Sequence, residues 1–353
     1  MNGINVYHPI KVLTQRGMVE LKDIVPGDKV VEYESGELLP IIGKTVPTQD
    51  LIYKVIYNDK RCQFVGSKDY IYNGTNIIPV SKINDKTEFK KIKQYPINHI
   101  NKSYEYPVYP DHYIAGAFLI YGDYNDKYLN IPLKMSGIND VFANKYCVEY
   151  CMDYINAEGK AYFKYQGKYG DKITWNEFFN GADTYEQLTT LSYIDIPSMY
   201  KYAALKDRIQ FIRGVFDAGY FPKLFGDDIV GIIHYDISKL KVFQEMLWSV
   251  GVLSKIEYNP FIYPKSDFKY NLQVIGDYHG YPGFTYMVDN IEHLLIKDNQ
   301  IINYDPPFSF SIDRIVAEDM SGYNHATGYL SNLVLKKPHA LYITDNYLPR
   351  VSM

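Results

Sequence analysis

The sequence has few of the residues that build disulfide frameworks, and no long apolar run. Its three cysteines are Cys62, Cys147 and Cys151, which form no metal-binding or disulfide pattern. The apolar runs are far shorter than the roughly 20 residues that a membrane-spanning helix needs. The opening residues, MNGINVYHPI, lack the basic-then-apolar order of a signal peptide. We therefore expect no metal, no cofactor, no membrane partner and no secretion by a signal peptide.

An excess of positive charge is also missing. The formal net charge is −4, and residues 106–300 hold 18 Lys and Arg against 24 Asp and Glu. Neutralisation of phosphates supplies most of a protein's affinity for DNA. The balance therefore argues against DNA as a partner. A short basic run at 90–93 fits either a nucleic-acid or partner patch or a solvated loop.

Tyrosine, in contrast, is abundant, with 37 residues. Together with the many Asn, Ile and Lys residues, this content is typical of an AT-rich genome. It also suits protein–protein contact, because a rigid ring buries area at low entropic cost. The two interpretations do not exclude each other.

Two apolar runs each carry a glycine and predict short helices. Residues 113–124 read Y-I-A-G-A-F-L-I-Y-G-D-Y, and residues 211–220 read F-I-R-G-V-F-D-A-G-Y. Both runs resemble the signature helices of LAGLIDADG homing endonucleases. The resemblance implies that the two helices pack side by side, with Gly116 and Gly214 allowing their backbones to touch.

In that family an acidic residue at each helix end holds catalytic metal, and here those positions fall on Tyr121 and Gly219. Hard divalent cations need oxygen ligands such as carboxylates. Asp123 and Asp217 lie two residues away, which is roughly 200° of helical rotation. We therefore expect no metal at this axis.

The two ends of the chain share a second resemblance. The run I-V-P-G-D-K-V at 24–30 follows a predicted strand and turn, and the run H-A-L-Y-I-T-D-N-Y-L lies at 339–348. These runs resemble the first and last blocks of inteins and other Hint (hedgehog/intein) domains. The similarity covers both ends of the chain and leaves the endonuclease-like part as an insertion.

Protein splicing needs a nucleophile at the first position, a histidine in the second block and a terminal His-Asn pair. The aligned positions are Asn5, Tyr70 and Val351-Ser352, none of which is the expected residue. A tyrosine of ordinary pKa, about 10, is a poor acid–base group near neutral pH. We expect that all of the catalytic positions have degenerated, and that His339 is structural.

Together these features predict an α+β fold, in which a β-rich Hint domain is interrupted by an α/β, pseudo-twofold LAGLIDADG-like domain. The expected parts are 1–105, 106–300 and 301–353. Because the reactive groups are missing, we expect a chain that is not an enzyme and serves as a structural or adaptor component of a phage virion, in its tail or baseplate. Its partners would be other particle proteins, and its location the virion or the host cytoplasm. The alternative is a DNA-binding protein or a residual LAGLIDADG homing endonuclease.

Overall fold

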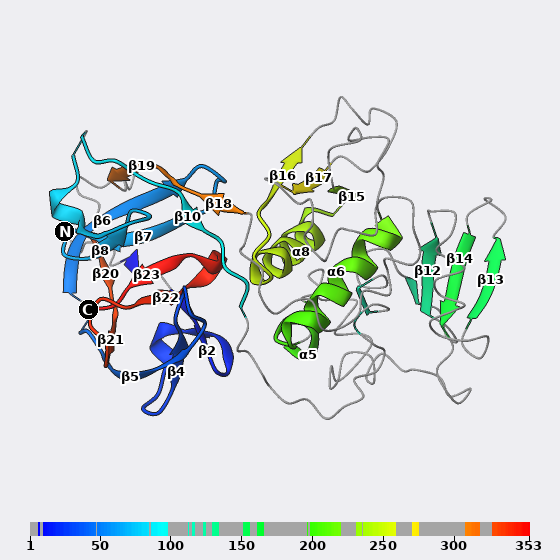
Figure 1. The fold of residues 1–353 in the computed structure, drawn as a ribbon, viewed down its shortest axis with the longest axis horizontal. Coiled ribbons are helices and arrows are strands. Elements are labelled where there is room, and N and C mark those ends of the chain that lie inside the picture. Colours follow the sequence, from blue (N-terminus) through cyan, green and yellow to red (C-terminus); the bar gives the residue numbers. More distant parts are fainter. Residues whose placement is uncertain are drawn as a thin grey trace. The chain divides into compact units, whose positions relative to one another are not determined.

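The computed structural model describes the two ends of the chain almost continuously, and its middle in separate segments. The described residues are 6–7, 10–46, 48–84, 86–97, 112, 115–116, 123–124, 129–133, 151–155, 161–165, 196, 198–219, 231–234, 236–258, 270–274, 308–317 and 327–353. These residues form an α+β architecture that is rich in strands (Figure 1), as the sequence predicts. None of the helices in these segments is long and apolar enough to cross a membrane.

The chain forms two compact units. The first unit joins Met1–Lys102 to Pro306–Met353, and the second is Ser103–Asp305. The first unit is therefore built from both ends of the chain, with the second unit inserted between them.

One sheet of the first unit has the strand order β21-β5-β4-β2-β3. Its strands are β2 (Lys11–Thr14), β3 (Gly17–Glu20), β4 (Lys29–Val31), β5 (Leu38–Lys44) and β21 (Leu333–Leu335). All of its neighbouring strands are antiparallel. The C-terminal strand β21 thus completes a sheet that the N-terminal residues begin.

A second sheet of this unit is organised around its longest strand, β6. Its order is β1-β20-β6-β19, with β7 also paired to β6. These strands are β1 (Val6–Tyr7), β6 (Thr48–Tyr57), β7 (Cys62–Gly66), β19 (Ile312–Ala317) and β20 (Thr327–Leu330). Both β19 and β20 come from the C-terminal piece and pair antiparallel with β6, so this sheet also joins the two ends of the chain.

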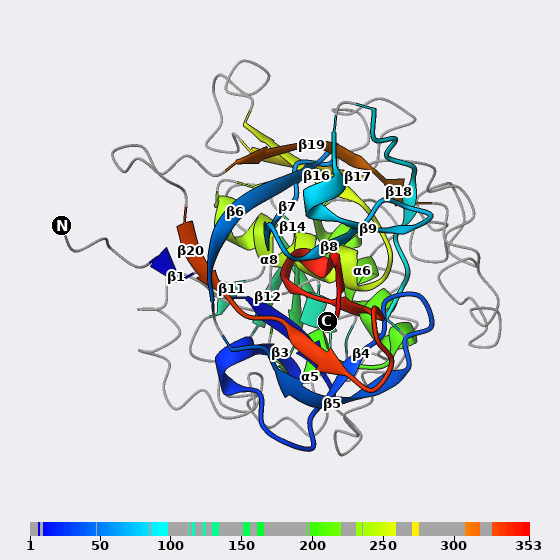
Figure 2. The same ribbon diagram turned by 90° about the vertical axis from the view of Figure 1, so that its left-hand side faces the viewer.

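Short elements complete the unit, and Figure 2 shows the red C-terminal strands among the N-terminal ones. They are β8 (Tyr70–Tyr72) with β9 (Ile77–Pro79), β10 (Ile92–Lys93) with β18 (Ser309–Phe310), β22 (Leu341–Ile343) with β23 (Pro349–Val351), and the 3-10 helices Leu21–Asp23, Val80–Lys82 and Asp345–Tyr347. The pattern at 77–83 predicts a strand and its turn, and the structure has the strand β9 as far as Pro79, followed by a 3-10 helix. The basic run at 90–93 is also not entirely a loop, since Ile92 is buried in β10.

The hydrophobic core of the first unit draws on both pieces of chain. Val12, Val30 and Ile52 from the N-terminal piece pack with Leu333 and Tyr342 from the C-terminal piece, and four of the five have no exposed surface. Burial of each such side chain contributes roughly 1.5–3 kcal/mol. The shared core therefore stabilises the joining of the two ends.

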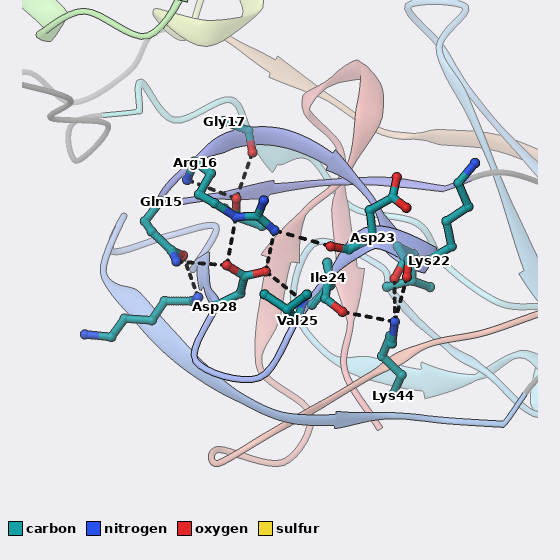
Figure 3. A network of polar contacts seen from close by, with 12 residues as sticks. Gln15, Arg16, Gly17, Lys22, Asp23, Ile24, Val25, Asp28 and Lys44 are labelled. Carbon is teal, nitrogen blue, oxygen red and sulfur yellow. Dashed lines mark hydrogen bonds and ion pairs between the residues drawn. The ribbon is translucent and has the colours of Figure 1, made fainter. Parts of the chain in front are cut away.

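The P-G-D sequence at 26–28 forms a turn whose conformation and hydrogen bonds depend on Gly27 and Asp28 (Figure 3). Gly27 has a φ of +94°, a conformation that favours glycine. The buried carboxylate of Asp28 accepts from Arg16 Nη2 at 2.6 Å and from the backbone N–H of Val25 at 2.9 Å. Hydrogen bonding from Arg16 lowers the pKa of Asp28. Asp28 thus ties this turn to the turn between β2 and β3.

The first half of the second unit contains a four-stranded antiparallel sheet of order β11-β12-β14-β13. Its strands are β11 (Asp123–Tyr124), β12 (Leu129–Leu133), β13 (Cys151–Ile155) and β14 (Ala161–Tyr165). Ala115 and Gly116, from the first predicted helix, are helical and buried, as is His112 just before it. Asp123–Tyr124, at the end of that run, form the strand β11, and the other residues of the run lie outside the described residues.

The second half contains α5 (Ser198–Lys201), α6 (Leu205–Gly219), β15 (Gly231–His234), α8 (Ile237–Ser249), β16 (Ser254–Tyr258) and β17 (Tyr270–Val274). Its sheet has the order β15-β17-β16. The helix α8 begins where Asp236 accepts the backbone N–H of Ser238 at 2.8 Å. It ends before Gly251, whose φ is +86°. The sequence pattern predicts a strand at 229–234 and an amphipathic helix at 238–250. The helix is confirmed within one residue, and the strand over its described residues 231–234.

Candidate functional site

The backbone of the first signature helix touches α6 directly. A Cβ atom added to Gly116 would lie 1.9 Å from the carbonyl oxygen of Phe211 and 2.8 Å from its carbonyl carbon. No side chain fits at such distances, so only glycine allows this approach. The contact on α6 is at Phe211, one helical turn before the buried Gly214.

Aromatic side chains and a buried arginine surround this contact. Tyr200 lies between His112 and Phe211, with ring centroids 5.2 Å and 5.9 Å away. Arg208 of α6 is fully buried and donates from Nη1 to the carbonyl and hydroxyl oxygens of Ser249 at 2.6 and 2.8 Å. Arg208 therefore joins α6 to the C-terminal end of α8.

The positions aligned with metal ligands are placed only in part. Gly219 is the last residue of α6, and Tyr121 lies outside the described residues. In the described segments no group of three or more His, Cys, Asp or Glu side chains could hold a metal ion. The residues that the structure places at the helix ends thus supply no ligand set, and we derive no step through a metal.

The sheet of the second half presents a polar row on the face opposite its packed face. Leu272 in β17 is fully buried, and α8 contacts this strand. Successive residues of a strand point to opposite faces, so Gln273 lies on the other face, directly paired with Lys255 of β16. The ammonium group of Lys255 lies 2.7 Å from the carboxylate of Glu257, and both side chains are more than 40% exposed. Lys255, Glu257 and Gln273 are named here the sheet row.

The first unit brings together some of the positions aligned with splicing residues. The ring of Tyr70 in β8 contacts the ring of His339 in a tilted arrangement, with centroids 4.7 Å apart, and β8 contacts β23. Ser352, just after β23, is fully buried, and its backbone N–H donates to the carbonyl oxygen of Ala340 at 2.9 Å. Asn5 lies outside the described residues. Tyr70 and Ser352 thus belong to one region around β8 and β23.

A buried polar cluster, which we define as Asp69, Asn332, Tyr342 and Arg350, lies in this region. Arg350 Nη2 donates to Asp69 Oδ2 at 2.9 Å, and Asn332 Nδ2 donates to Asp69 Oδ1 at 3.3 Å. The Tyr342 hydroxyl donates to Asn332 Oδ1 at 2.7 Å, and burial raises the pKa of Tyr342 to about 12. Because Asn332 Nδ2 also donates to the carbonyl oxygen of Val351 at 3.1 Å, the cluster holds the peptide group that precedes Ser352.

Sequence reasoning missed this cluster. Asp69 immediately precedes Tyr70, the position that aligns with the expected histidine of the second block. Arg350 is a charged residue between the apolar neighbours Pro349 and Val351, and a charged residue in an apolar strand is a signal of buried pairing. Asn332 carries no such signal, because its partners are distant in the sequence.

Comparison with known proteins finds similarity in structure only. No protein-family model matches the chain, and no curated protein matches it. A crystal structure of the gp41-1 intein matches at 20% identity and a TM-score of 0.20, over 21% of this chain and 57% of the intein, so the chain spans little more than half of that protein.

The homing endonuclease I-DmoI also matches in structure. Its structure in complex with DNA and Mn matches at 12% identity and a TM-score of 0.27, over 46% of this chain and 88% of that chain. Mesophilic variants of the same endonuclease match at 12% identity and a TM-score of 0.28. The chain is thus similar to an intein over one part and to a homing endonuclease over another, the architecture that its sequence predicts.

Two expectations from the sequence are corrected by these matches. The expectation that the chain is not an enzyme is wrong, because an intein and a homing endonuclease are both enzymatic kinds of protein. The expectation against DNA as a partner is wrong as well, because the matching endonuclease is solved with DNA bound. A total charge over 195 residues does not give the charge on any one face of the fold, so it does not decide whether DNA binds. The matches name no phage particle, so a place in a tail or baseplate stays a prediction.

Proposed function

We propose that the second unit is a homing-endonuclease-like module that binds duplex DNA, carried by an intein-like first unit. The proposal places the boundaries near those of the two compact units, with 1–105 and 301–353 as the intein-like parts and 106–300 as the insertion. One observation carries the proposal: the two halves of the second unit repeat the same arrangement around the Gly116 contact.

The repetition can be followed strand by strand. In the first half, the helical residues 115 and 116 are followed by β11 and β12, and β14 pairs with both β12 and β13. In the second half, α6 is followed by β15, and β17 pairs with both β15 and β16. The orders β12-β14-β13 and β15-β17-β16 therefore correspond, and every pair is antiparallel. The helix α6 contacts both β12 and β15, so the two sheets share a central helix.

This arrangement has dimensions that suit a DNA groove. Each of the paired strands β13, β14, β16 and β17 has five residues, or about 17 Å at roughly 3.3 Å per residue. The major groove is about 12 Å wide and admits a two-stranded ribbon. Two corresponding sheets can therefore read two successive half-sites.

The sheet row supplies chemistry for such contact. Lysine donates to guanine O6 and N7 or to phosphate oxygens, and glutamine recognises adenine through paired hydrogen bonds. Lys255 and Gln273 are neighbours on the face away from α8, and neither is buried. The row can thus combine phosphate binding with base reading.

A gel-shift series with the full chain and mixed duplexes tests the proposal. Binding is expected to weaken as salt rises, and Lys255→Ala is expected to reduce the slope of log K against log salt by about 1. Lys241→Ala serves as the matched control, because Lys241 is exposed on α8 rather than on the sheet. The same reactions with Mg²⁺ report any cleavage. If no complex forms at 50 mM salt, or if its affinity does not fall as the salt concentration rises, the proposal is contradicted.

A further inference from the structure

Residues 80–93 of the first unit carry a set of exposed lysines, which we name the basic arm. Its members are Lys82, Lys86, Lys90, Lys91 and Lys93. The first four form no ion pair with any other residue that the structure describes. Among the described residues of this stretch, Glu88 is the only exposed acidic one. The arm therefore presents charge of almost one sign.

The middle of the arm is fixed against the hairpin of β8 and β9. Asn73 is buried, donates from Nδ2 to the carbonyl oxygen of Glu88 at 3.1 Å, and accepts the backbone N–H of Lys90 at 2.8 Å. A Cβ atom added to Gly74 would lie 2.6 Å from the carbonyl oxygen of Lys90 and 2.9 Å from that of Lys91. Hydrogen bonds and a backbone contact that glycine permits thus hold this part of the arm.

The two ends of the arm are held as well. The side chain of Asn84 accepts the backbone N–H of Lys86 at 2.9 Å. Ile92 is 1% exposed and pairs with β18, and the hydroxyl of Tyr33 donates to the carbonyl oxygen of Lys93 at 2.8 Å. The lysines therefore extend from a backbone that the fold already orders, and a partner binds them without the cost of ordering it.

The apolar side chains of this stretch point inward. Val80, Ile92 and Ile97 are each at most 6% exposed, and no large apolar side chain among the described residues of 80–97 is among the exposed ones. The centres of protein interfaces depend on apolar and aromatic anchors and contain little lysine. Binding to a membrane surface needs an inserted apolar face besides basic charge. A phosphate backbone needs only the charge, so this pattern favours a nucleic acid.

We propose that the basic arm binds the phosphate backbone of duplex DNA. Each ammonium group that meets a phosphate releases a counterion, so the arm adds affinity that depends on salt and not on base sequence. The arm belongs to the first unit and the sheet row to the second, so this is a contact surface beyond the one proposed above. The choice of DNA as the source of the phosphates rests on the proposed function of the second unit.

Fluorescence anisotropy with the full chain and a labelled duplex of mixed sequence, from about 0.05 to 0.3 M salt, tests the proposal. The triple variant Lys86→Gln, Lys90→Gln and Lys91→Gln removes three ammonium groups but keeps the main-chain bonds that hold the arm. Its slope of log K against log salt is expected to be shallower by about 2–3, at roughly 0.9 for each lost phosphate contact. An unchanged slope overturns the proposal.

A second triple variant controls for net charge. Lys29→Gln, Lys336→Gln and Lys337→Gln remove the same charge from exposed positions of the first unit outside the arm, and together they are expected to change the slope by less than about 1. A reduction as large as that from the arm variant would show a general charge effect and overturn the proposal. Polyglutamate at an equal concentration of charge is expected not to displace the duplex. Displacement would assign the arm to an acidic protein instead.

The variant Lys255→Ala separates this proposal from the function proposed for the second unit. The arm variant and Lys255→Ala are expected to reduce the slope additively, because they change separate sites. If Lys255→Ala reduces the slope and the arm variant does not, the arm has no role and the function of the second unit stands. If only the arm variant reduces it, the arm binds DNA and the sheet row does not.

Discussion

The α-carbon of Gly116 lies so close to the Phe211 backbone that an added Cβ atom would sit 1.9 Å from the Phe211 carbonyl oxygen. This contact joins two helices that are nearly 100 positions apart in the sequence. Because the obstructing atoms belong to the backbone, no change of side-chain rotamer can relieve the overlap.

Gly116→Ala is therefore expected to destabilise the second unit by about 3 kcal/mol, at the upper end of the cost of overpacking. Urea unfolding followed by tryptophan fluorescence measures the effect, because Trp248 lies in α8 of that unit. Gly43→Ala is the matched control, since a Cβ atom at Gly43 meets no atom within 4 Å. A change below 0.5 kcal/mol in Gly116→Ala would show that the helices do not touch there.

The buried polar cluster predicts strong coupling between two side chains. Asn332→Ala leaves the Tyr342 hydroxyl and Asp69 short of partners, and it is expected to cost about 3 kcal/mol of unfolding free energy in the first unit. Tyr342→Phe removes one hydrogen bond and is expected to cost about 1 kcal/mol.

The double variant separates this hydrogen bond from independent packing effects. Once Asn332 is gone, the change Tyr342→Phe no longer removes the hydrogen bond to Asn332 and costs less than in the unchanged chain, so the two costs do not add. Chemical denaturation of the four proteins in the cycle measures the coupling. Strictly additive costs would show that the two side chains do not share a hydrogen bond.

The turn network predicts a loss of stability in acid. The pKa of Asp28 is lowered in the folded chain, with the hydrogen bond from Arg16 as the main cause. A carboxyl group with a lowered folded pKa stabilises the fold above its unfolded pKa, about 3.9, and that contribution is lost as the pH falls through the folded value.

Urea unfolding between pH 2.5 and 7 is expected to show this loss below about pH 4. Asp28→Asn removes the titrating group, and its stability is expected to be lower at pH 7 and to change less across the acid range. Glu37→Gln is the control, because it alters an exposed carboxylate without these bonds. Parallel pH profiles for the unchanged chain and Asp28→Asn would contradict the role given to Asp28.

The sheet row predicts a variant that binds DNA more tightly. Glu257 holds the ammonium group of Lys255 at 2.7 Å, and an exposed ion pair of this kind contributes at most about 1 kcal/mol. Glu257→Gln removes a negative charge from the face and frees Lys255 for phosphate. We expect Kd for duplex DNA to fall about threefold to tenfold at low salt, with no change in thermal stability.

The charge-matched comparison is Glu245→Gln, because Glu245 also pairs with a lysine, Lys201, but lies on α8. Fluorescence anisotropy with labelled duplexes measures both variants. Equal tightening by the two would indicate a general charge effect, and the sheet face would then lose its assigned role.

The sequence predicts the architecture well where the signal is local. Gly27 and Gly251 mark turns through their positive φ values, and Asp236 caps the start of α8. Gly116 permits a close approach to the Phe211 backbone of α6. These features depend on properties of one or a few adjacent residues, which a sequence shows directly.

The polar cluster could not be predicted, because Asp69 meets partners more than 260 positions away. The sheet row is hidden for a similar reason, since Lys255 and Gln273 become neighbours only through strand pairing. Summing charges over 106–300 likewise does not show which residues share a face. The positions where family residues are missing likewise do not reveal the groups that the fold brings together, such as the buried polar cluster.

Selection from a randomised duplex library tests the central claim most directly. The full chain is mixed with duplexes at about 0.15 M salt, and the retained DNA is sequenced over several rounds. The account predicts enrichment of a site with two half-sites, and weaker selection at specific positions when Gln273 is changed to Ala. Retained DNA with no enriched sequence, or enrichment that Gly116→Ala and Gln273→Ala both leave unchanged, would contradict it.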